Sequence, residues 1–467
     1  MTFQNLLSKM WILLLGFILF LTAVICRPLI PIDETRYMSV AWEMWLHNGW
    51  FDPLTKNFEP YHHKPPLLFW LINAFWSLFG VSRWAGTLPV VIASCLCIYL
   101  TGILGKTLAK DNPSSPLLNP QRTSLIMAAS LPFFIYGTLV MFDFLLCMFV
   151  LISLILIVRY SYKRHPLDLI LLGLCLGLGV LTKGPVAYLY ILPIFLLAPF
   201  WNKDLKNLKS WYASCLGAIL VSAIPVLFWL IPMTKASDND FAFWLVWNQT
   251  AGRVTGNFGD AHVRPIYFYL PFLPLFLMPW ILFPAVWKFL PTLKSKLPTD
   301  TGLRFILCWF VPVFIAFCLI SGKQVHYMVP LVPAMALFFA YALHTLKQKT
   351  LIITLIAIVS FITLSQIVAK HTLLEKYDLM PIADYIHNNS DKKIAFVTNY
   401  HAEFSFLARL TKPIEDVKEE HLKSWFQKNP DGIAIVKYRK FSDLDGYHVK
   451  FDMKYRGRNK AVIALYH

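Results

Sequence analysis

Charged residues are scarce in this sequence of 467 residues, of which 15% are charged and 57% are hydrophobic. Soluble globular chains carry about a quarter charged residues, so this shortage excludes a water-soluble fold for most of the chain. The formal net charge of +17 is compatible with nucleic-acid binding, but no basic face interleaved with aromatic residues occurs. We therefore expect membrane lipids as partners and no nucleic acid.

Several other patterns are missing. The eight cysteines lie within or at the end of apolar stretches and include no C-x-x-C pair, which argues against a disulfide framework or a zinc-binding knuckle. No H-E-x-x-H or H-x-x-x-H pattern and no glycine-rich phosphate loop occurs. No internal repeat is evident, whereas many transporters are built from repeated halves.

Long apolar runs dominate what is present. A membrane-spanning helix needs about 20 mostly apolar residues, and eleven segments qualify approximately. Residues 10–26 resemble a signal-peptide core, but no small-x-small cleavage site follows, so we interpret them as an uncleaved first span. The shorter run 67–81 is expected to lie in the interface, to re-enter or to cross. The eleven segments are 10–27, 84–105, 123–140, 142–158, 166–181, 185–200, 211–231, 266–287, 303–320, 326–344 and 350–368.

Loop charges predict the orientation. With the N-terminus in the cytoplasm, the predicted cytoplasmic connections carry more Lys and Arg than the loops on the opposite face, as the positive-inside rule requires. The sequence thus predicts a transmembrane catalytic domain, 1–369, with outer loops at about 28–66 and 232–265. In a Gram-negative bacterium the outer face is the periplasm, and the protein would be a multi-pass inner-membrane protein.

The last hundred residues have a different composition, with no run long enough to span. "KKIAFVT", "GIAIVKY" and "AVIALYH" read as short buried strands, and "EEHLKSWFQKN" reads as an amphipathic helix. We predict a small α/β domain over 370–467, on the same outer face as the first loop.

Charges cluster unexpectedly in the first outer loop. "DETRY" supplies Asp33, Glu34, Arg36 and Tyr37 directly after the first span. The apolar spacing of the following residues predicts an amphipathic helix lying along the membrane surface. Such charges either cap that helix and anchor lipid headgroups, or they line a cavity at the bilayer interface.

A lone carboxylate strengthens the second interpretation. Asp143, in "LVMFDFLLCMF", is the only charged residue between Arg122 and Arg159. Ionisable groups inside apolar segments are costly and usually functional, with a partner elsewhere. A neutral or snorkelling aspartate near the interface is the alternative. In the predicted topology Asp143 lies near the outer end of its span, on the face that carries Asp33.

Cations gather at the same predicted boundary. "YHHKPP" supplies Lys64, "AHVRP" supplies Arg264, and "SGKQVHY" supplies Lys323. Cationic donors there suit a lipid-linked phosphate. Lys183, in "TKGP", also reads as an ordinary lysine at a helix end.

At these motifs the sequence resembles a known family. "DETRY…EMWLHNGWFDPLTKN…YHHKPPLLFWL", "FDFLL", "AHVRPIYFYLP" and "GKQVHYMVPLVPAMAL" look like the bacterial lipid A aminoarabinose transferases. More broadly they resemble the polyprenyl-phosphate-dependent C-type (GT-C) glycosyltransferases, which include protein mannosyltransferases. The likeness extends from about residue 30 to 340. The chain departs from the family at His63, where the family commonly has glutamate.

The resemblance implies a fold and a site. It implies an all-α polytopic GT-C membrane fold of about 11–13 transmembrane helices, with a small C-terminal α/β domain. Asp33 and Asp143 match the acidic pair, and we count Glu34 with them as a catalytic candidate. Lys64 and Arg264 match the donor-phosphate ligands, to which we add Lys323. The candidates for the sugar and acceptor cavity are Tyr37, Tyr61, Tyr327 and Arg36, and His262 is a candidate ligand of a divalent metal ion.

The resemblance also implies the reaction. A single sugar, 4-amino-4-deoxy-L-arabinose or a related amino sugar, would pass from undecaprenyl phosphate to lipid A or another envelope acceptor on the periplasmic side. Transfer of a hexose to protein or an envelope glycan is the same-fold alternative. A lipid-linked sugar flippase and a structural scaffold are the alternatives from other classes. The scaffold leaves Asp143 unexplained, and polar residues at one face without a repeat argue against transport.

Overall fold

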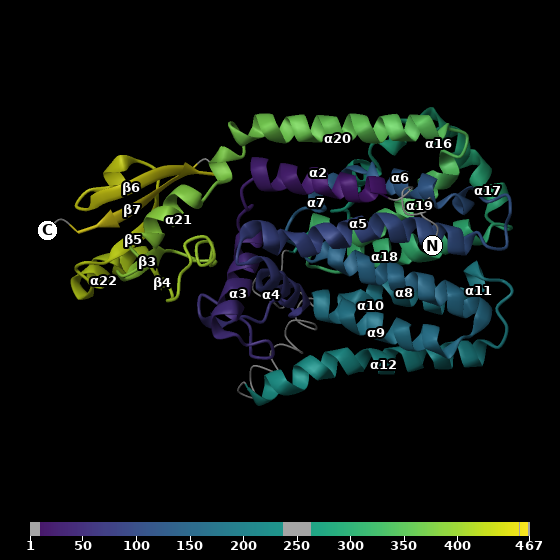
Figure 1. The fold of residues 1–467 in the computed structure, drawn as a ribbon, viewed down its shortest axis with the longest axis horizontal. Helices are drawn as coiled ribbons and strands as arrows, with labels where there is room; N and C mark the ends of the chain where they lie inside the picture. The colour runs from purple at the N-terminus through teal and green to yellow at the C-terminus, as the bar shows by residue number, and fades with distance from the viewer. Residues whose placement is uncertain (1–9, 237–262, 457, 466–467) are drawn as a thin grey trace. The chain divides into compact units, whose positions relative to one another are not determined.

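The computed structural model describes residues 10–236, 263–456 and 458–465 (Figure 1). Contacts divide the chain into two compact units. Unit 1 comprises residues 1–20, 62–68 and 87–362, and unit 2 comprises residues 21–61, 69–86 and 363–467. Residues 28–61 of the first outer loop thus group with the C-terminal segment, and residues 62–66 group with unit 1, whereas the sequence suggested one boundary near 369. That boundary stays a prediction.

Apolar helices form most of unit 1. Among the described residues, seven segments are long and apolar enough to cross a membrane, and three shorter apolar helices accompany them. The protein is therefore a mainly helical, multi-pass membrane protein, as predicted. The seven are α5 (Arg83–Leu108), α8 (Asp143–Lys163), α9 (Pro166–Lys183), α12 (Leu208–Lys235), α18 (Thr301–Leu319), η6 with α19 (Val325–Leu331 and Val332–Ala342) and α20 (Gln348–Lys370). The shorter three are α2 (Met10–Cys26), α4 (Leu67–Phe79) and α10 (Val186–Leu196).

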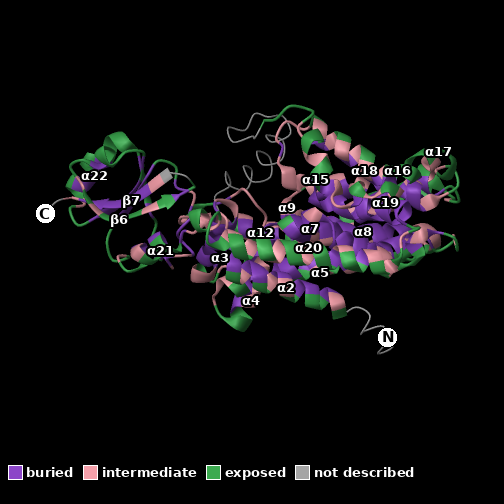
Figure 2. Ribbon diagram, turned by 90° about the horizontal axis from the view of Figure 1, so that it is seen from above, coloured by how far each residue is buried: buried purple, intermediate pink, exposed green. Residues whose placement is uncertain are grey.

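Burial separates central helices from peripheral ones (Figure 2). In the most apolar stretch of α8, 72% of residues are buried, and in η6 with α19 the share is 78%. The corresponding shares are 22% in α12 and 11% in α20. Because exposed apolar side chains need an apolar solvent, α12 and α20 present the most surface to lipid among these seven described segments, while α8 lies in the core.

Small residues let α9 approach α12 closely. Gly173 and Gly177 lie one helical turn apart on α9, and a Cβ built on Gly177 would lie 2.4 Å from the backbone oxygen of Ser222 in α12. Small residues spaced in this way bring membrane helices into close backbone contact. This contact helps to fix α9, which carries Lys183 at its end.

Three of the predicted continuous spans are interrupted. The segment 123–140 forms α6 (Pro120–Ala128) and α7 (Leu131–Tyr136), and 185–200 forms α10 and α11 (Ala198–Trp201). The segment 266–287 forms a series of short helices that begin near its four prolines. Proline removes a backbone donor and clashes with the preceding turn, so an apolar run was insufficient evidence for an unbroken helix here.

Unit 2 contains the predicted helix after the first span, but residues 37–44 are buried on every side, so its predicted amphipathic character is not seen. This helix is α3 (Asp33–His47), which ends at Asn48 with φ of 50°. The short hairpin β1 (Thr55–Lys56) and β2 (Glu59–Pro60) follows it, and β1 packs on α3. Glu43 of α3 accepts hydrogen bonds from the backbone N–H groups of Asn57 (2.6 Å) and Phe58 (2.8 Å), which fixes the hairpin on the helix.

The C-terminal segment forms the predicted α/β domain, a mixed five-stranded sheet in the order β4-β3-β5-β7-β6. Strand β3 pairs in parallel with β4 and β5, and β7 pairs antiparallel with β5 and β6. The three predicted strands correspond to β3, β5 and β7, and the predicted helix corresponds to α22. Their bounds are β3 (Ile394–Val397), β4 (Glu415–Val417), β5 (Ile433–Tyr438), β6 (His448–Tyr455), β7 (Arg458–Ala464) and α22 (Leu422–Lys428).

The two faces of the sheet build two apolar clusters. Phe396 and Ile435 point to the face covered by α21 (Met380–His387), and Val397 and Val436 point to the face covered by α22. This alternation follows from the two-residue period of a strand. The remaining elements are short: η1 (Pro116–Leu118), η3 (Leu270–Phe272), α15 (Leu273–Leu277), η4 (Trp280–Leu282), α16 (Pro284–Phe289), η5 (Leu290–Thr292), α17 (Leu293–Lys296), η7 (Glu375–Tyr377), η8 (Glu419–His421) and η9 (Phe441–Leu444).

Candidate active site

In unit 1 the lone carboxylate has a cationic partner. Asp143 begins α8 and Lys183 ends α9, and the two helices pack against each other. Lys183 Nζ donates to Asp143 Oδ1 at 2.5 Å, and the exposed fractions of the two side chains are 6% and 2%. The sequence "TKGP" places Lys183 among the cations of the outer face, but it equally fits an ordinary lysine at a helix end. The sequence signal for this pair is a single carboxylate, Asp143, at the start of one apolar run and a single cation, Lys183, at the end of the next.

The opposite end of the same helix pair carries a different ion pair. Arg159 Nη2 lies 2.9 Å from Asp168 Oδ1, but the Arg159 side chain is 59% exposed. Water therefore screens that pair, whereas the pair of Asp143 and Lys183 is closed to water on both sides. This difference distinguishes the two ends of the α8–α9 hairpin.

Further polar groups surround the buried pair. Lys64 and His326 both interact electrostatically with Asp143. Lys64 Nζ lies 5.7 Å from the ring centroid of Phe142, and Lys183 Nζ lies 4.6 Å from that of Tyr327. Unit 1 thus brings together three of the predicted residues, Asp143, Lys64 and Tyr327.

The other two predicted phosphate ligands also lie side by side. The backbone of residues 263–264 pairs with residues 321–322, and the buried Lys323 donates from Nζ to the backbone oxygen of Arg264 at 2.9 Å. The Arg264 side chain is exposed and lies 5.9 Å from the ring of Phe268. Because Tyr327 N–H donates to the backbone oxygen of Gln324, this turn leads directly to the residues beside Asp143.

In unit 2 the first turn of α3 carries a partly exposed carboxylate, Asp33, beside a guanidinium, Arg36. Arg36 Nη2 lies 2.5 Å from Asp33 Oδ1, and the Tyr37 hydroxyl donates to the same oxygen at 3.3 Å. The Asp33 side chain is 48% exposed and that of Arg36 is 25% exposed. Burial raises the pKa of Tyr37, so its hydroxyl stays protonated and able to donate. Asp33 is therefore held in place and remains accessible.

Two predicted tyrosines flank one phenylalanine. The rings of Tyr37 and Tyr61 each lie edge-on to Phe69, with centroids 6.4 Å apart in both pairs. Burial opposes the charge of Arg36, but Tyr61, Tyr37 and Asp33 together outweigh that effect and raise the pKa of its guanidinium. Arg36 therefore stays cationic beside these oxygens.

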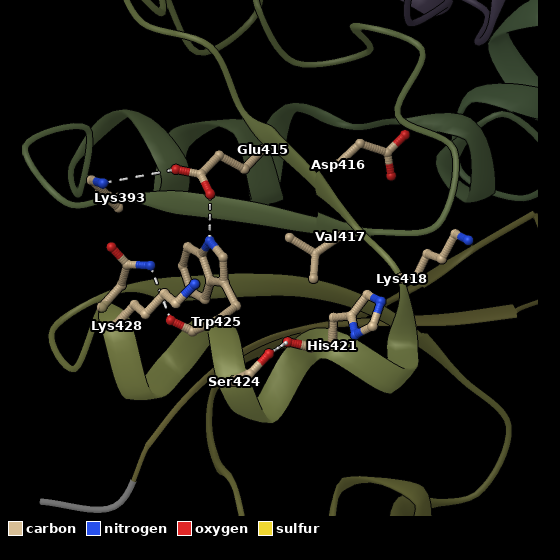
Figure 3. A pocket seen from close by; sticks show the side chains of 10 residues that line it. Lys393, Glu415, Asp416, Val417, Lys418, His421, Ser424, Trp425 and Lys428 are labelled. Atoms are coloured by element: carbon tan, nitrogen blue, oxygen red, sulfur yellow. Dashed lines mark hydrogen bonds and ion pairs between the residues drawn. The ribbon is translucent and has the colours of Figure 1, made fainter.

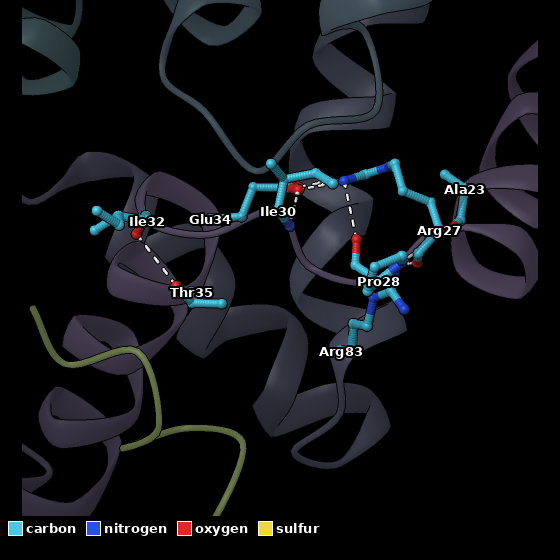
Figure 4. Close-up of polar contacts among 8 residues, drawn as sticks. All are labelled: Ala23, Arg27, Pro28, Ile30, Ile32, Glu34, Thr35 and Arg83. Atoms are coloured by element: carbon cyan, nitrogen blue, oxygen red, sulfur yellow. Dashed lines mark hydrogen bonds and ion pairs between the residues drawn. The ribbon is translucent and has the colours of Figure 1, made fainter. Parts of the chain in front are cut away.

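Glu34 occupies a different environment from Asp33. Its buried carboxylate forms an ion pair with Arg27, and its Oε2 accepts the backbone N–H of Ile30 at 2.8 Å (Figure 4). Arg83 donates to the backbone oxygens of Ala23 and Arg27 in the same group. These contacts fold the chain between α2 and α3 back on itself. Arg27 follows the first apolar run and precedes "DETRY", but no motif in the sequence indicates its pairing with Glu34.

The described residues contain no group of three or more His, Cys, Asp or Glu side chains that could hold a metal ion. His262, the predicted metal ligand, lies outside the described residues. The rings of His62 and His63 stack with centroids 4.8 Å apart. The divalent ion and its ligand His262 stay predictions.

A hollow of about 750 Å³ in the C-terminal domain contains none of the predicted site residues (Figure 3). Its two carboxylates have partners in the domain: Glu415 accepts from Trp425 Nε1 at 2.6 Å, and Asp416 accepts from the backbone N–H of Tyr400 at 3.1 Å. The hollow and the candidate site residues do not overlap.

The fold places the chain in a structural class, the polytopic membrane proteins with the GT-C fold. Two structures of ArnT from Cupriavidus metallidurans superpose on the chain, each covering 97% of both chains. The apo form gives a TM-score of 0.78 at 14% identity, and the form bound to undecaprenyl phosphate gives 0.72 at 15% identity. The predicted fold class is confirmed.

Sequence comparison leads to particular relatives. Residues 63–229 match the family described as dolichyl-phosphate-mannose-protein mannosyltransferase. The undecaprenyl phosphate-alpha-4-amino-4-deoxy-L-arabinose arabinosyl transferase 2 of Proteus mirabilis is 28% identical over 351 residues, which are 72% of this chain and 60% of that protein. The chain thus spans about 60% of the length of this curated relative. The resemblance noted at the motifs is confirmed.

Proposed function

We propose that this protein is a membrane glycosyltransferase that moves one sugar from undecaprenyl phosphate to lipid A. The sugar is 4-amino-4-deoxy-L-arabinose or a related amino sugar. The observation that carries the proposal is the polar group at one end of α8 and α9, where Asp143, Lys183 and Lys64 meet beside Tyr327. Similarity to arabinosyl transferases that are named for this donor supports the same reaction.

The cations suit the leaving group. In the proposed reaction the bond between the sugar anomeric carbon and the phosphate oxygen breaks, and negative charge grows on the departing undecaprenyl phosphate. Lys64, Arg264 and Lys323 are the residues we assign to that phosphate. Preplaced charges stabilise such a transition state most effectively where water is excluded.

The carboxylates act on the acceptor side. We assign Asp33 and Asp143 to the reaction and give Glu34, which is paired with Arg27, a positioning role among the acidic residues. If the acceptor is a hydroxyl group, its oxygen attacks the anomeric carbon and a carboxylate takes its proton. If the acceptor is a lipid A phosphate, the nucleophile is already anionic and no proton moves, so the aspartates would position it or bind a metal ion.

The aromatic and guanidinium groups complete the assignment. Tyr37, Tyr61, Tyr327 and Arg36 are assigned to the sugar and acceptor cavity. We place the site on the periplasmic side of the bacterial inner membrane, together with the C-terminal domain, because the Lys and Arg bias of the loops favours that orientation. A divalent ion held by His262 is part of the family expectation, and no step of this mechanism requires it.

A second acceptor class also has a specific basis. The match of residues 63–229 to the protein mannosyltransferase description favours a hexose donor or a protein or glycan acceptor. His63, in place of the family's usual glutamate, leaves the donor sugar open. A lipid-linked sugar flippase is a weaker third candidate, since the polar residues gather at the ends of helices α8 and α9.

The test uses the full-length protein purified in detergent. Incubation with undecaprenyl-phosphate aminoarabinose and lipid A should give lipid A heavier by one sugar in mass spectrometry. A matched incubation with mannosyl donor and a peptide or glycan acceptor tests the second acceptor class. Sugar transfer in neither reaction, combined with movement of the donor across proteoliposomes, would establish the flippase instead.

A further inference from the structure

A loop of the C-terminal domain is tied to the helix that carries Asp33. Residues 398–414, which follow β3, are named here the docking loop, and they belong to the same compact unit as α3. Trp42 Nε1 of α3 donates to the backbone oxygen of Leu410 at 2.8 Å, and the backbone N–H of Phe406 donates to Ser39 Oγ of α3 at 3.0 Å. Both bonds are buried.

The hairpin after α3 is tied to the other end of this segment. Asn57 Nδ2 donates to the backbone oxygen of Ile414, and the backbone N–H of Ile414 donates to Asn57 Oδ1, each at 2.8 Å. Because Glu43 of α3 holds the backbone of Asn57, these bonds join helix, hairpin and docking loop. An amide side chain that uses both its donor and its acceptor on one backbone position fixes a register.

Ring contacts fill the space between these bonds. Phe406 stacks on Trp76 of α4 with ring centroids 5.3 Å apart and an interplanar angle of 5°. The Arg409 guanidinium lies 4.2 Å from the ring of Phe406 and 5.2 Å from that of Trp42. Arg409 Nη2 also donates to the backbone oxygen of Val81 at 3.2 Å. The loop is therefore packed as well as hydrogen bonded.

The attachment reaches the reactive end of the helix. Arg36, which pairs with Asp33, interacts electrostatically with His401 of the docking loop and with Lys56 of the hairpin. The backbone N–H of His401 donates to Glu403 Oε2 at 2.9 Å, and Glu403 is buried. A shift of the docking loop would therefore change the surroundings of the Asp33–Arg36 pair.

We infer that the docking loop positions α3 for the transfer reaction, so that the C-terminal domain is a working part of the catalytic apparatus. Ser39, Asn57 and Arg409 are positioning residues, since they act through α3 and touch no reacting atom. The inference rests on the proposed function and deepens it. The competing view is that these contacts only stabilise the domain. That view predicts no change in amide exchange within α3 and no change in turnover when the contacts are removed.

The first test compares two asparagines. Asn57 and Asn48 have φ values of 57° and 50°, a region that glycine adopts freely, so Asn57→Gly and Asn48→Gly are matched changes. Only Asn57→Gly removes the bonds to Ile414. Two partly buried hydrogen bonds correspond to about tenfold or more in an equilibrium. We expect amide exchange in residues 33–47 to rise about tenfold in Asn57→Gly and to stay unchanged in Asn48→Gly.

Turnover is measured on the same samples. Asn57→Gly should lower kcat for sugar transfer about tenfold and leave the donor KM within about twofold, because the donor-phosphate residues are untouched. Unchanged exchange in α3, or faster exchange with normal kcat, would overturn the inference. If wild-type protein transfers no sugar from any donor, the proposed function fails, and the exchange measurement still decides whether the loop orders α3.

A milder variant, Ser39→Ala, provides the same test if Asn57→Gly does not fold. Ser39→Ala deletes the acceptor of the Phe406 N–H, and Ser77→Ala on α4 deletes a hydroxyl that bonds only within its own helix. Alanine favours helix more than serine does, so a purely local effect would slow exchange in α3. Faster exchange in Ser39→Ala alone supports the inference, and slower exchange contradicts it.

Discussion

Lys183 Nζ lies 2.5 Å from Asp143 Oδ1, and the pair joins the last residue of α9 to the first residue of α8. Both side chains are almost fully buried. A buried pair contributes little net stability, but removal of one partner leaves an uncompensated charge. The pair therefore fixes the aspartate at one place and makes the local structure depend on both residues.

A double-mutant cycle separates the stability of this pair from its role in transfer. Asp143→Asn and Lys183→Met should each lower the free energy of unfolding by about 3–5 kcal/mol, while the double variant recovers most of that loss. None of the three should transfer sugar at an appreciable rate. Thermal unfolding in detergent and the mass-spectrometric transfer assay measure the two properties.

The control for this cycle is Arg159→Gln at the opposite end of the hairpin. Its partner Asp168 is buried, but Arg159 itself is largely exposed, so water can replace part of the interaction. Transfer should persist in this variant. Normal transfer by Asp143→Asn would remove Asp143 from the site.

Substitutions of the adjacent residues Asp33 and Glu34 should affect different properties, catalysis for Asp33 and stability for Glu34. Asp33→Asn keeps its hydrogen-bonding shape on an accessible side chain, so we expect normal thermal unfolding and a loss of about 100-fold in kcat. Glu34→Gln leaves the buried Arg27 without its counter-charge, so we expect a lower unfolding temperature. The same substitution at the exposed Glu59 serves as the control. Equal loss of stability in both α3 variants would contradict the separation of roles.

Lys64 is predicted to bind the donor phosphate. Lys64→Ala should weaken binding of undecaprenyl phosphate about tenfold or more, as expected for loss of a charge-assisted hydrogen bond. Lys163→Ala, at the other end of α8, should leave it unchanged. Fluorescence or calorimetric titration in detergent measures the affinity, and equal affinities in the two variants would refute the assignment.

A buried lysine in the sheet predicts a pH dependence of stability. Lys460 on β7 is 1% exposed, and its Nζ lies 4.3 Å from the ring of Tyr455 and 5.2 Å from that of Phe396. Burial lowers the pKa of Lys460 from 10.5 to about 8. The protonated side chain therefore destabilises the folded domain below pH 8, and that penalty disappears as the pH rises from 8 to 10.5.

Lys460→Met tests this directly. It should stabilise the domain by about 3 kcal/mol at pH 7, and its advantage over wild type should shrink to nothing near pH 10.5. Lys454→Met, on the exposed face of β6, should show no such trend. Unfolding followed from pH 7 to 10.5 provides the measurement, and a constant difference across that range would count against the explanation.

Sequence patterns predicted the elements that depend on local chemistry. The apolar spacing after "DETRY" predicted α3, and the runs "KKIAFVT" and "GIAIVKY" predicted β3 and β5. The edge strand β4 was missed because three residues with two acids carry no alternating apolar pattern. The apolar runs 123–140 and 266–287 predicted one continuous helix each. Both segments instead form several short helices, because prolines interrupt the helix despite the apolar composition.

The partners of charged residues could not be predicted in the same way. Asp143 was identified as a lone carboxylate that needs a partner, but nothing near it in the sequence indicates Lys183. Pairing depends on how α8 and α9 turn back on each other, and many lysines at helix ends look alike. Arg27 and Glu34 are close in sequence, yet their pairing depends on the fold of the intervening chain.

The bonds between Asn57 and Ile414 have a consequence for biosynthesis. The ribosome delivers α3 to the membrane long before it makes the backbone on which that helix comes to rest. Chains cut short ahead of residue 414 would still be inserted into the bilayer, but their "DETRY" segment would lack its final support.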